Sequence, residues 1–331
     1  MTVELGYYRT KDERRKATLY PEKHFREKAS RVVSLKGGYE HNYDFPLLLY
    51  RDLARLSPDI IICAPDWGGL AAWVYGKLHD TRYIIWSEAT PLTEARRHPL
   101  KRPLRKFIYS RAWRFVVPGA LAEEYIRGFV PGAQVFFANN AIQFEDDFLI
   151  SEAEVAEKFQ KDKIQLTFSG SLIEMKGIDL LLQGFTKLLT THPELSQRLS
   201  LVLLGTGPRD YREYQDGAIT FAGFCEGQRY IEHFKSSHVF ILPSLSDPNP
   251  LTVIEALFTG NVLIVSDAVG SHPEAVNGNG FVIPTGSAEE IYKILEHIAT
   301  LPREVLVTMA KRSVALARNF TTQRSAEGFL S

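Results

Sequence analysis

The stretch "IQLTFSGSLIEMKGIDLLLQGFTKLL" (residues 164–189) places a strand, a loop and a helix in direct succession. Its first five residues, IQLTF, form a short apolar run typical of a strand buried on both faces. The second part predicts an amphipathic helix with the apolar stripe Ile178, Leu181, Leu182, Phe185, Leu188 and Leu189. A strand that leads through small residues into such a helix is the unit from which parallel α/β sheets are built.

The same alternation of apolar runs and helical periodicity occurs along almost the whole chain. The apolar runs of the first half are RVVSL (31–35), DIIIC (59–63), RYIIW (82–86), RFVVP (114–118) and QVFFA (134–138). Those of the second half are IQLTF (164–168), LVLLG (201–205), ITFAG (219–223), VFILP (239–243) and VLIVS (262–266). Two such series in 331 residues predict an α/β protein with two doubly wound parallel-sheet (Rossmann-like) domains.

The boundary between the two domains is expected in the acidic, polar stretch 141–163. We therefore predict a first domain over residues 1–150 and a second over residues 151–315. The tail predicts a C-terminal helix at 316–331. That helix packs back on the first domain or stays with the second, and its sequence favours neither.

Composition is that of a soluble globular protein, with 45% hydrophobic and 24% charged residues. No apolar run reaches the ~18 residues of a membrane-spanning helix, and the N-terminus lacks the apolar core of an export signal. Cys63 and Cys225 are far apart and show no disulfide or metal spacing, which fits a reducing cytosol. The net charge of zero conceals +7 in residues 1–145 and −7 in the remainder, which suggests different partners or arises by chance.

Ligands of doubly wound sheets bind outside the carboxyl ends of the strands, and three loops of the second half follow such ends. In GSLIEMKG (170–177), small residues allow a ligand to approach, and Lys176 adds a positive charge before the helix. Together with the helix N-terminus this favours a phosphate, the alternative being an exposed lysine beside a helix cap. The spacing is not that of a P-loop. The second loop, LGTGPRD (204–210), predicts no more than a tight turn near a ligand.

The third loop opens "SDPNPLTVIEALFTG" (246–260), which has two carboxylates on either side of a helix start. Pro250 suits the first helical position, and the free amides that follow it can hold a phosphate. Glu255 leans back toward those amides and suits paired hydroxyls such as a ribose diol. Asp247 lies ahead of the helix and suits the hydroxyls of a sugar. The alternative is a loop aspartate and a solvated helix glutamate.

Taken in order, GSLIEMKG, LGTGP, FAGF, PSLSDPNPLTVIEAL and VSDAVGSHPEAV…NGFVIP resemble the nucleotide-binding domain of retaining glycosyltransferases of family 4. The resemblance covers residues 160–300 well and residues 45–145 more loosely. It implies the GT-B fold, in which two Rossmann-like domains face a cleft. It also implies a catalytic set in which Lys176 braces the diphosphate, Asp247 contacts the transferred sugar and Glu255 binds the ribose. The implied donor-binding residues are Gly170, Ser171, Phe224, Cys225, Asn249, Leu251 and Thr252.

The chain departs from the family pattern at several positions. Asp247 replaces the usual glutamate, and Ser171 replaces an arginine, which removes a positive charge from the diphosphate site. The family's histidine after the strand matching RYIIW is absent, and Glu88 near that position is either an acceptor-side residue or an ordinary loop carboxylate. The first 30 residues read as irregular where the family begins with a strand, and Gly37–Gly38 would supply the family's glycine loop.

The resemblance implies a hexosyltransferase that retains anomeric configuration and needs no cofactor, because the UDP- or GDP-sugar is its substrate. The sequence has no metal-binding cluster and no Asp-x-Asp motif, so we expect the enzyme to be metal-independent. The acceptor would be a saccharide or a lipid-linked sugar in surface polysaccharide or glycolipid biosynthesis. One alternative is a catalytically weak homologue that acts as a nucleotide-sugar-binding subunit of a transferase complex, and another is a sugar-nucleotide epimerase of the same fold.

A basic stretch at 94–115 with interspersed apolar residues would lie on an anionic bilayer, at the inner face of the membrane, or pack by its apolar side with a solvated basic side. No nucleic-acid-binding motif accompanies this stretch, so we expect no nucleic-acid partner. The expected location is the cytoplasm, with or without peripheral attachment to the membrane.

Overall fold

A computed structural model describes residues 4–7, 11–12, 17–18, 31–34, 46–95, 101–142 and 144–330. The chain divides into two compact units. Unit 1 consists of Met1–Ser87, His98–Val116 and Ile126–Val135, and unit 2 of Glu88–Arg97, Val117–Tyr125 and Phe136–Ser331. The sequence-based boundary between residues 150 and 151 stays a prediction. The proposed glycine loop at Gly37–Gly38 lies outside the described residues.

Unit 1 contains a sheet of order β5-β6-β7-β8, in which β5 to β7 are parallel neighbours. Its strands are β5 (Ile60–Cys63), β6 (Arg82–Trp86), β7 (Arg114–Val117) and β8 (Val135–Phe137), close to the predicted runs. Helix α2 (Pro46–Leu56) precedes β5. The helices between the strands are α3 (Trp67–His79), α5 (Lys101–Tyr109) and α6 (Ala120–Arg127), with the short α4 (Pro91–Ala95) after β6.

Near the N-terminus, β1 (Glu4–Tyr7) pairs in parallel with β4 (Arg31–Ser34), and β2 (Lys11–Asp12) pairs antiparallel with β3 (Ala17–Thr18). For the described residues 4–7, 11–12 and 17–18, the expectation of an irregular N-terminal segment was therefore wrong. A strand of four residues in a charged segment gives too short an apolar pattern to stand out.

Unit 2 contains a fully parallel sheet of order β11-β10-β9-β12-β13-β14. The strands are β9 (Ile164–Ser169), β10 (Leu199–Leu204), β11 (Ile219–Gly223), β12 (Val239–Leu242), β13 (Val262–Ser266) and β14 (Gly280–Ile283). In chain order this is the 3-2-1-4-5-6 arrangement of a doubly wound fold. The order reverses between β9 and β12, so the carboxyl ends of these two strands form the topological switch point where such folds bind ligands.

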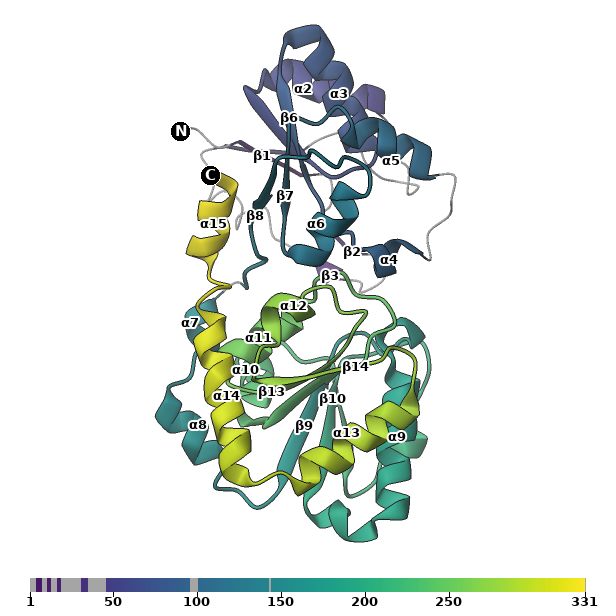
Figure 1. Ribbon diagram of the computed structural model, residues 1–331, viewed down its shortest axis with the longest axis vertical. Coiled ribbons are helices and arrows are strands. Elements are labelled where there is room, and N and C mark those ends of the chain that lie inside the picture. Colours follow the sequence, from purple (N-terminus) through teal and green to yellow (C-terminus); the bar gives the residue numbers. More distant parts are fainter. Residues whose placement is uncertain are drawn as a thin grey trace. The chain divides into compact units, whose positions relative to one another are not determined.

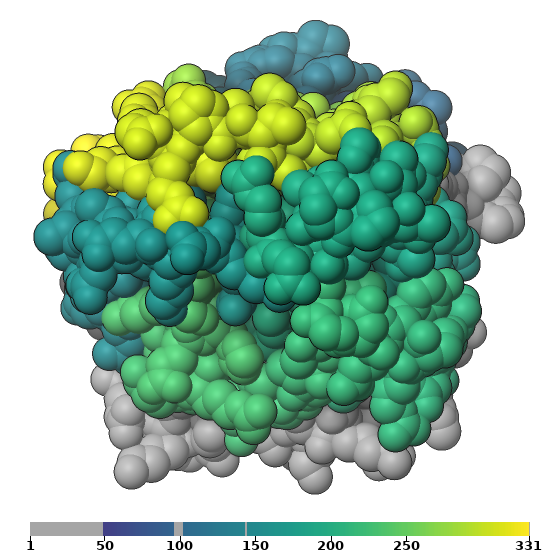
Figure 2. Space-filling model, turned by 90° about the horizontal axis from the view of Figure 1, so that it is seen from below, coloured from purple at the N-terminus to yellow at the C-terminus, as the bar shows by residue number. Residues whose placement is uncertain are grey.

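Helices cover both faces of this sheet (Figure 1). On one face α9 (Ile178–Thr191) packs against α13 (Ala288–Thr300), and on the other α11 (Leu251–Phe258) packs against α14 (Arg303–Ala317). In Figure 2 the yellow α14 lies beside the teal α8. The remaining elements are α7 (Glu145–Phe148), α8 (Glu152–Lys158), α10 (Gly227–Ser236), α12 (His272–Ala275), α15 (Thr322–Leu330), and the 3₁₀ turns η1 (Glu174–Lys176), η2 (Pro193–Gln197) and η3 (Arg212–Tyr214).

The core of unit 2 is built from the apolar runs that identified the strands. Leu166 and Phe168 of β9 are fully buried, as is Phe240 of β12. The predicted stripe of α9 is buried from Ile178 to Leu188, whereas Leu189 is half-buried. Burial of each such side chain contributes roughly 1.5–3 kcal/mol, so the sheet and its helices hold the loops at the strand ends in fixed positions.

The C-terminal helix α15 begins where the Thr322 amide donates to Glu145 Oε2 at 2.8 Å. Near its end, a Cβ atom at Gly328 would lie 2.0 Å from the Phe137 carbonyl oxygen, so the helix backbone approaches the end of β8 closely. Glu145, Phe137 and α15 all belong to unit 2.

Candidate functional site

The loops that follow β9 and β12 meet at the switch point of unit 2. The Leu245 amide of the second loop donates to the Met175 carbonyl of the first at 2.8 Å. Gly177, which ends η1, has φ of 72°, and a Cβ atom there would lie 2.0 Å from the Pro243 carbonyl oxygen. Only glycine fits this conformation and this close contact. Gly177 also separates Lys176 from α9, which was expected to begin directly after the lysine.

The predicted tight turn after β10 lies against the loop that follows β9. Leu172 donates its amide to the Thr206 carbonyl at 2.9 Å, and the Gly170 amide donates to the Leu204 carbonyl at 3.0 Å. A Cβ atom at Gly205 would lie 1.9 Å from the Gly170 carbonyl oxygen. The turn therefore packs directly against Gly170 and Leu172 of the loop that follows β9.

Lys176 and Asp247, predicted for separate tasks, form an ion pair with each other. The Asp247 side chain is 8% exposed and that of Lys176 is 26% exposed. Burial raises the pKa of the Asp247 carboxyl, and the Lys176 ammonium opposes this shift. The Asp247 backbone is held on both sides, because its amide donates to Ala268 and its carbonyl accepts from Gly270. In this ion pair, Asp247 is buried on a fixed backbone, whereas the Lys176 side chain is more accessible to solvent.

Glu88 lies in the same part of unit 2 and has a partner that the sequence did not indicate. Its Oε1 accepts a hydrogen bond from Asn140 Nδ2 at 2.6 Å. Burial raises the pKa of the Glu88 carboxyl, the Asn140 hydrogen bond lowers it, and the negative charge of Asp247 raises it further. The two carboxylates therefore interact electrostatically, which places Glu88 near the Lys176–Asp247 pair. The one available signal for Asn140 was its place just after the apolar run QVFFA.

Packing around Gly270 shows that the segment after β6, which carries Glu88, lies close to the loop after β12, which carries Asp247. A Cβ atom at Gly270 would lie 2.0 Å from the Pro248 carbonyl oxygen and 2.8 Å from Thr90 Cγ2. Thr90 is two residues beyond Glu88, and Pro248 directly follows Asp247. The segment after β6 and the loop after β12 therefore pack on the same glycine.

Glu255 forms a separate polar contact, with Tyr230. The Tyr230 hydroxyl of α10 donates to Glu255 Oε2 at 2.6 Å, and Ser169 Oγ lies 3.0 Å from the same hydroxyl. Burial raises the pKa of the Glu255 carboxyl to about 7, although the Tyr230 hydrogen bond acts to lower it. The alternative of a solvated helix glutamate is therefore wrong, whereas the role of Glu255 toward a ribose stays a prediction. Tyr230 was missed because nothing in its local sequence marks it.

At the N-terminus of α11, the amides of Leu251 and Thr252 donate no hydrogen bond to any other described residue, as the sequence predicted. Pro250 is the residue before the helix, with ψ of 124°, so its placement at the first helical position was wrong by one residue. Its ring fixes φ at a value that either position accepts. Val253 already donates to the Pro250 carbonyl, whereas Leu251 and Thr252 precede the first intrahelical bonds. Leu251 is exposed and Thr252 half-buried.

The other predicted donor residues lie at the same edge of the sheet, since all its strands are parallel. Asn249 is buried at 8% exposure in the loop after β12, and Ser171 is half-buried in the loop after β9. Phe224 and Cys225 follow β11, where the phenyl ring is 64% exposed and the thiol lies 3.7 Å from the Ala222 carbonyl oxygen. These contacts place the residues, and their roles toward a ligand stay predictions.

A further acid, the half-buried Glu274, lies within the motif SDAVGSHPEAV but was not predicted as a site residue. Its Oε1 accepts from the Ala120 amide at 2.7 Å, at the start of α6, and burial raises the pKa of its carboxyl. A Cβ atom at Gly119 would lie 2.5 Å from the Glu274 carboxylate, so a glycine precedes the helix here. Within unit 2, Glu274 therefore connects the loop after β13 to the segment around Ala120.

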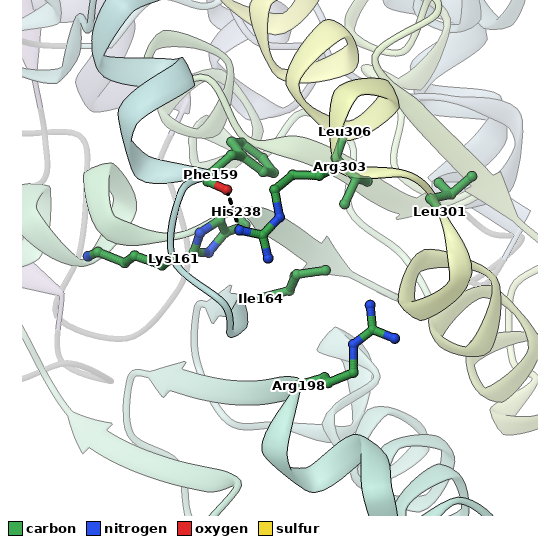
Figure 3. Close-up of a pocket in the computed structure, with 8 residues that line it drawn as sticks. All are labelled: Phe159, Lys161, Ile164, Arg198, His238, Leu301, Arg303 and Leu306. Atoms are coloured by element: carbon green, nitrogen blue, oxygen red, sulfur yellow. Dashed lines mark hydrogen bonds between the residues drawn. The ribbon is translucent and has the colours of Figure 1, made fainter.

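A small pocket of about 50 Å³ lies at the opposite, amino ends of the strands (Figure 3). Arg303 donates to the Phe159 carbonyl at 2.7 Å there, which ties α14 to the end of α8. The pocket is lined by Phe159, Lys161, Ile164, Arg198, His238, Leu301, Arg303 and Leu306. Because Ile164 and His238 stand at the starts of β9 and β12, this pocket is separate from the site at the switch point.

The basic stretch at 94–115 uses its apolar side for packing, where it is described. Ile108 and Tyr109 of α5 are fully buried, and the Phe107 ring meets the Trp73 ring edge-on with centroids 4.8 Å apart. Arg111 lies over the Phe107 ring at 3.9 Å. Part of the stretch, residues 96–100, lies outside the described residues. This packing leaves Arg102, Lys106 and Arg111 exposed for contact with an anionic surface, whereas Arg105 is buried.

Metal clusters and membrane-spanning helices are both absent from the described part of the chain. Among the described residues, no three His, Cys, Asp or Glu side chains gather in a way that could hold a metal ion. Within the same residues, none of the helices has both the length and the apolar character needed to cross a bilayer.

Comparison with known proteins identifies the region that carries this site. Residues 150–313 match the family model "Glycosyl transferases group 1". An uncharacterized glycosyltransferase of Methanocaldococcus jannaschii is 31% identical over 168 residues, which are 47% of this chain and 41% of the relative. A D-inositol 3-phosphate glycosyltransferase of Kribbella flavida is 27% identical over 188 residues, which are 52% of this chain and 43% of that protein. The chain thus spans less than half the length of these two relatives.

Among solved structures, Anabaena HepE in complex with UDP superimposes with a TM-score of 0.71 at 12% identity, covering 92% of this chain and 86% of that one. This likeness shows the fold, and with the two parallel sheets it confirms the GT-B expectation. Residues 150–313, which hold the Lys176–Asp247 pair and Glu255, are therefore the part of the chain that is similar to the glycosyl transferases group 1 family.

Proposed function

We propose that the protein is a retaining glycosyltransferase that moves a sugar from a UDP- or GDP-sugar to a saccharide or lipid-linked acceptor. The observation that carries this proposal is the Lys176–Asp247 pair at the switch point of a group 1 domain. The resemblance assigns one of these side chains to the diphosphate and the other to the sugar. A UDP complex of the similar structure HepE supports a uridine nucleotide as the first donor to try.

In this proposal the donor redistributes the charges of the site. The diphosphate attracts Lys176, which is the more exposed partner of the pair, and binds the free amides of Leu251 and Thr252. Asp247 is then free to accept hydrogen bonds from the sugar hydroxyls. Glu255, enclosed beside Tyr230, accepts from the ribose diol.

The reaction breaks the bond between the anomeric carbon and the diphosphate oxygen. The acceptor oxygen attacks from the face that the diphosphate leaves, and its proton passes to the departing diphosphate oxygen, so configuration is retained. Lys176 and the α11 amides stabilise the developing negative charge, and such electrostatic stabilisation contributes most of the rate enhancement in many enzymes. We place Glu88, oriented by Asn140, next to the acceptor hydroxyl, because it lies beside Asp247.

We also propose that the reaction needs no metal ion and that its acceptor is part of a surface polysaccharide or glycolipid. We expect no metal requirement, because Lys176 and the helix amides supply the positive potential that a metal ion would otherwise provide. The acceptor would belong to surface polysaccharide or glycolipid assembly in the cytoplasm. The exposed basic side chains of α5 would then bind anionic lipid by charge alone, without insertion of apolar residues.

A second candidate is a nucleotide-sugar-binding subunit with little activity of its own. Two observations favour it: Ser171 stands where the resemblance expects an arginine, and Lys176 is already neutralised by Asp247. A weaker positive potential at the diphosphate would lower catalysis more than binding.

One experiment tests the proposal and separates it from the second candidate. The protein is incubated with UDP-, GDP- and ADP-sugars, nucleoside diphosphate release is measured, and binding is followed by thermal shift. Release with at least one donor, lost in Lys176→Ala, supports the enzyme. Binding without release supports the subunit, and neither binding nor release contradicts both.

A further inference from the structure

Tyr230 links two parts of the candidate donor site. Its hydroxyl donates to Glu255 Oε2 at 2.6 Å and lies 3.0 Å from Ser169 Oγ. A phenol has a single proton, so the hydroxyl that donates to Glu255 must accept from Ser169. The three side chains therefore form a directed chain of hydrogen bonds from the end of β9, through α10, to α11.

The Tyr230 ring is held in place by aromatic neighbours. It lies 5.0 Å from the Phe234 ring and 6.3 Å from the Phe148 ring, measured between centroids, and the residue is half-buried. Because the ring is fixed, its hydroxyl has little freedom to turn away from Glu255. A hydrogen bond that is both short and supported by a second donor strengthens through mutual polarisation.

We infer that Tyr230 is a positioning residue for Glu255 and keeps the carboxylate oriented and ionised for a nucleotide ribose. The inference rests on the proposed function, in which Glu255 accepts hydrogen bonds from the ribose diol. Ser169 directly precedes Gly170 and Ser171 of the proposed phosphate loop. The chain of hydrogen bonds thus connects the phosphate side of the site to its ribose side.

The surroundings of Glu255 explain why this partner is needed. Among the described residues, no lysine, arginine or histidine forms an ion pair with Glu255, and Tyr230 is the titratable side chain that contacts it. Burial raises the pKa of the Glu255 carboxyl to about 7, and the tyrosine hydroxyl works against that rise. Loss of the hydroxyl therefore increases the protonated fraction near neutral pH, and a protonated carboxyl is a poorer acceptor for two hydroxyls.

The first test needs no ligand. Glutamate carboxyl carbons are labelled with ¹³C and titrated by NMR, and the Glu255 signal is assigned by its loss in Glu255→Gln. We expect Tyr230→Phe to move the Glu255 titration to higher pH and Ser169→Ala to move it less. Tyr292→Phe is the matched control, because Tyr292 donates to Glu296 at 3.1 Å within α13, a contact that does not involve Glu255. An unchanged Glu255 titration in Tyr230→Phe overturns the inference.

The second test measures UDP and GDP binding by calorimetry between pH 6 and pH 9. In Tyr230→Phe we expect an affinity loss near pH 7 of about fivefold if the Glu255 titration moves up by one pH unit, with recovery toward wild type at pH 9. A loss that is equal at all pH values indicates a merely structural role and overturns the inference. If the NMR shift is seen but the wild-type protein binds no nucleotide, the proposed function fails while the contact of Tyr230 with Glu255 stands.

Discussion

Replacement of Glu255 by glutamine should stabilise the protein at alkaline pH while it removes the ribose acceptor. Burial holds the native pKa of Glu255 at about 7, against an ordinary value of 4.5. The native state therefore binds this proton more tightly than the unfolded state, and wild-type stability falls as pH rises from 4.5 to 7. The total decrease in the free energy of unfolding is about 3 kcal/mol, of which about 2.5 kcal/mol develops between pH 5 and pH 8. Glutamine does not titrate, so Glu255→Gln escapes that loss.

The assay must report on unit 2, because all four tryptophans, at positions 67, 73, 86 and 113, lie in unit 1. Hydrogen exchange of α11 and β13 peptides, with urea unfolding followed by circular dichroism, reports on the unit that contains Glu255. We expect the stability advantage of Glu255→Gln to be larger at pH 8 than at pH 5 by about 2.5 kcal/mol. Any constant effect of the amide cancels in this difference. An advantage that is the same at both pH values, or larger at pH 5, would refute the reasoning.

Three further predictions follow from the other contacts of the site. Lys176→Ala should lower turnover about 100- to 1,000-fold, as loss of one charge-stabilising donor does elsewhere, whereas replacement of the exposed Lys187 of α9 by alanine should not. Equal effects of the two replacements in the turnover assay would contradict the role of Lys176. Glu88→Gln should raise the acceptor KM and leave nucleotide affinity unchanged in calorimetry, and a change confined to nucleotide affinity would reassign it to the donor side. Gly177→Ala should lower the melting temperature of unit 2 by several degrees, because its Cβ meets the Pro243 carbonyl; an unchanged melting temperature argues against that close approach.

The fold was largely predictable because its signal is local. Strands such as β9 and β12 are continuous apolar runs buried on both faces, so each run marked its own strand. β14 was missed as a strand because Gly280–Ile283 lies at the sheet edge and is only partly buried, which breaks the run. β1 was missed because four residues are too few to establish a period.

The candidate site was only partly predictable because its contacts join distant parts of the chain. The rule that ligands bind at strand carboxyl ends located Lys176, Asp247 and Glu255 one at a time. It did not show that the first two neutralise each other across 71 positions. Tyr230 and Asn140 were missed because their importance lies in a single hydrogen bond to a distant acid, and a lone polar residue in sequence carries no such mark.

Donor turnover with stereochemical readout tests the central claim most directly. UDP- and GDP-sugars are incubated with the protein and candidate saccharide acceptors, and the new glycosidic bond or released sugar is followed by ¹H NMR before mutarotation. The proposed function predicts nucleoside diphosphate release with retained anomeric configuration, lost in Lys176→Ala. Inverted configuration, or tight donor binding with no release from any donor, would contradict it.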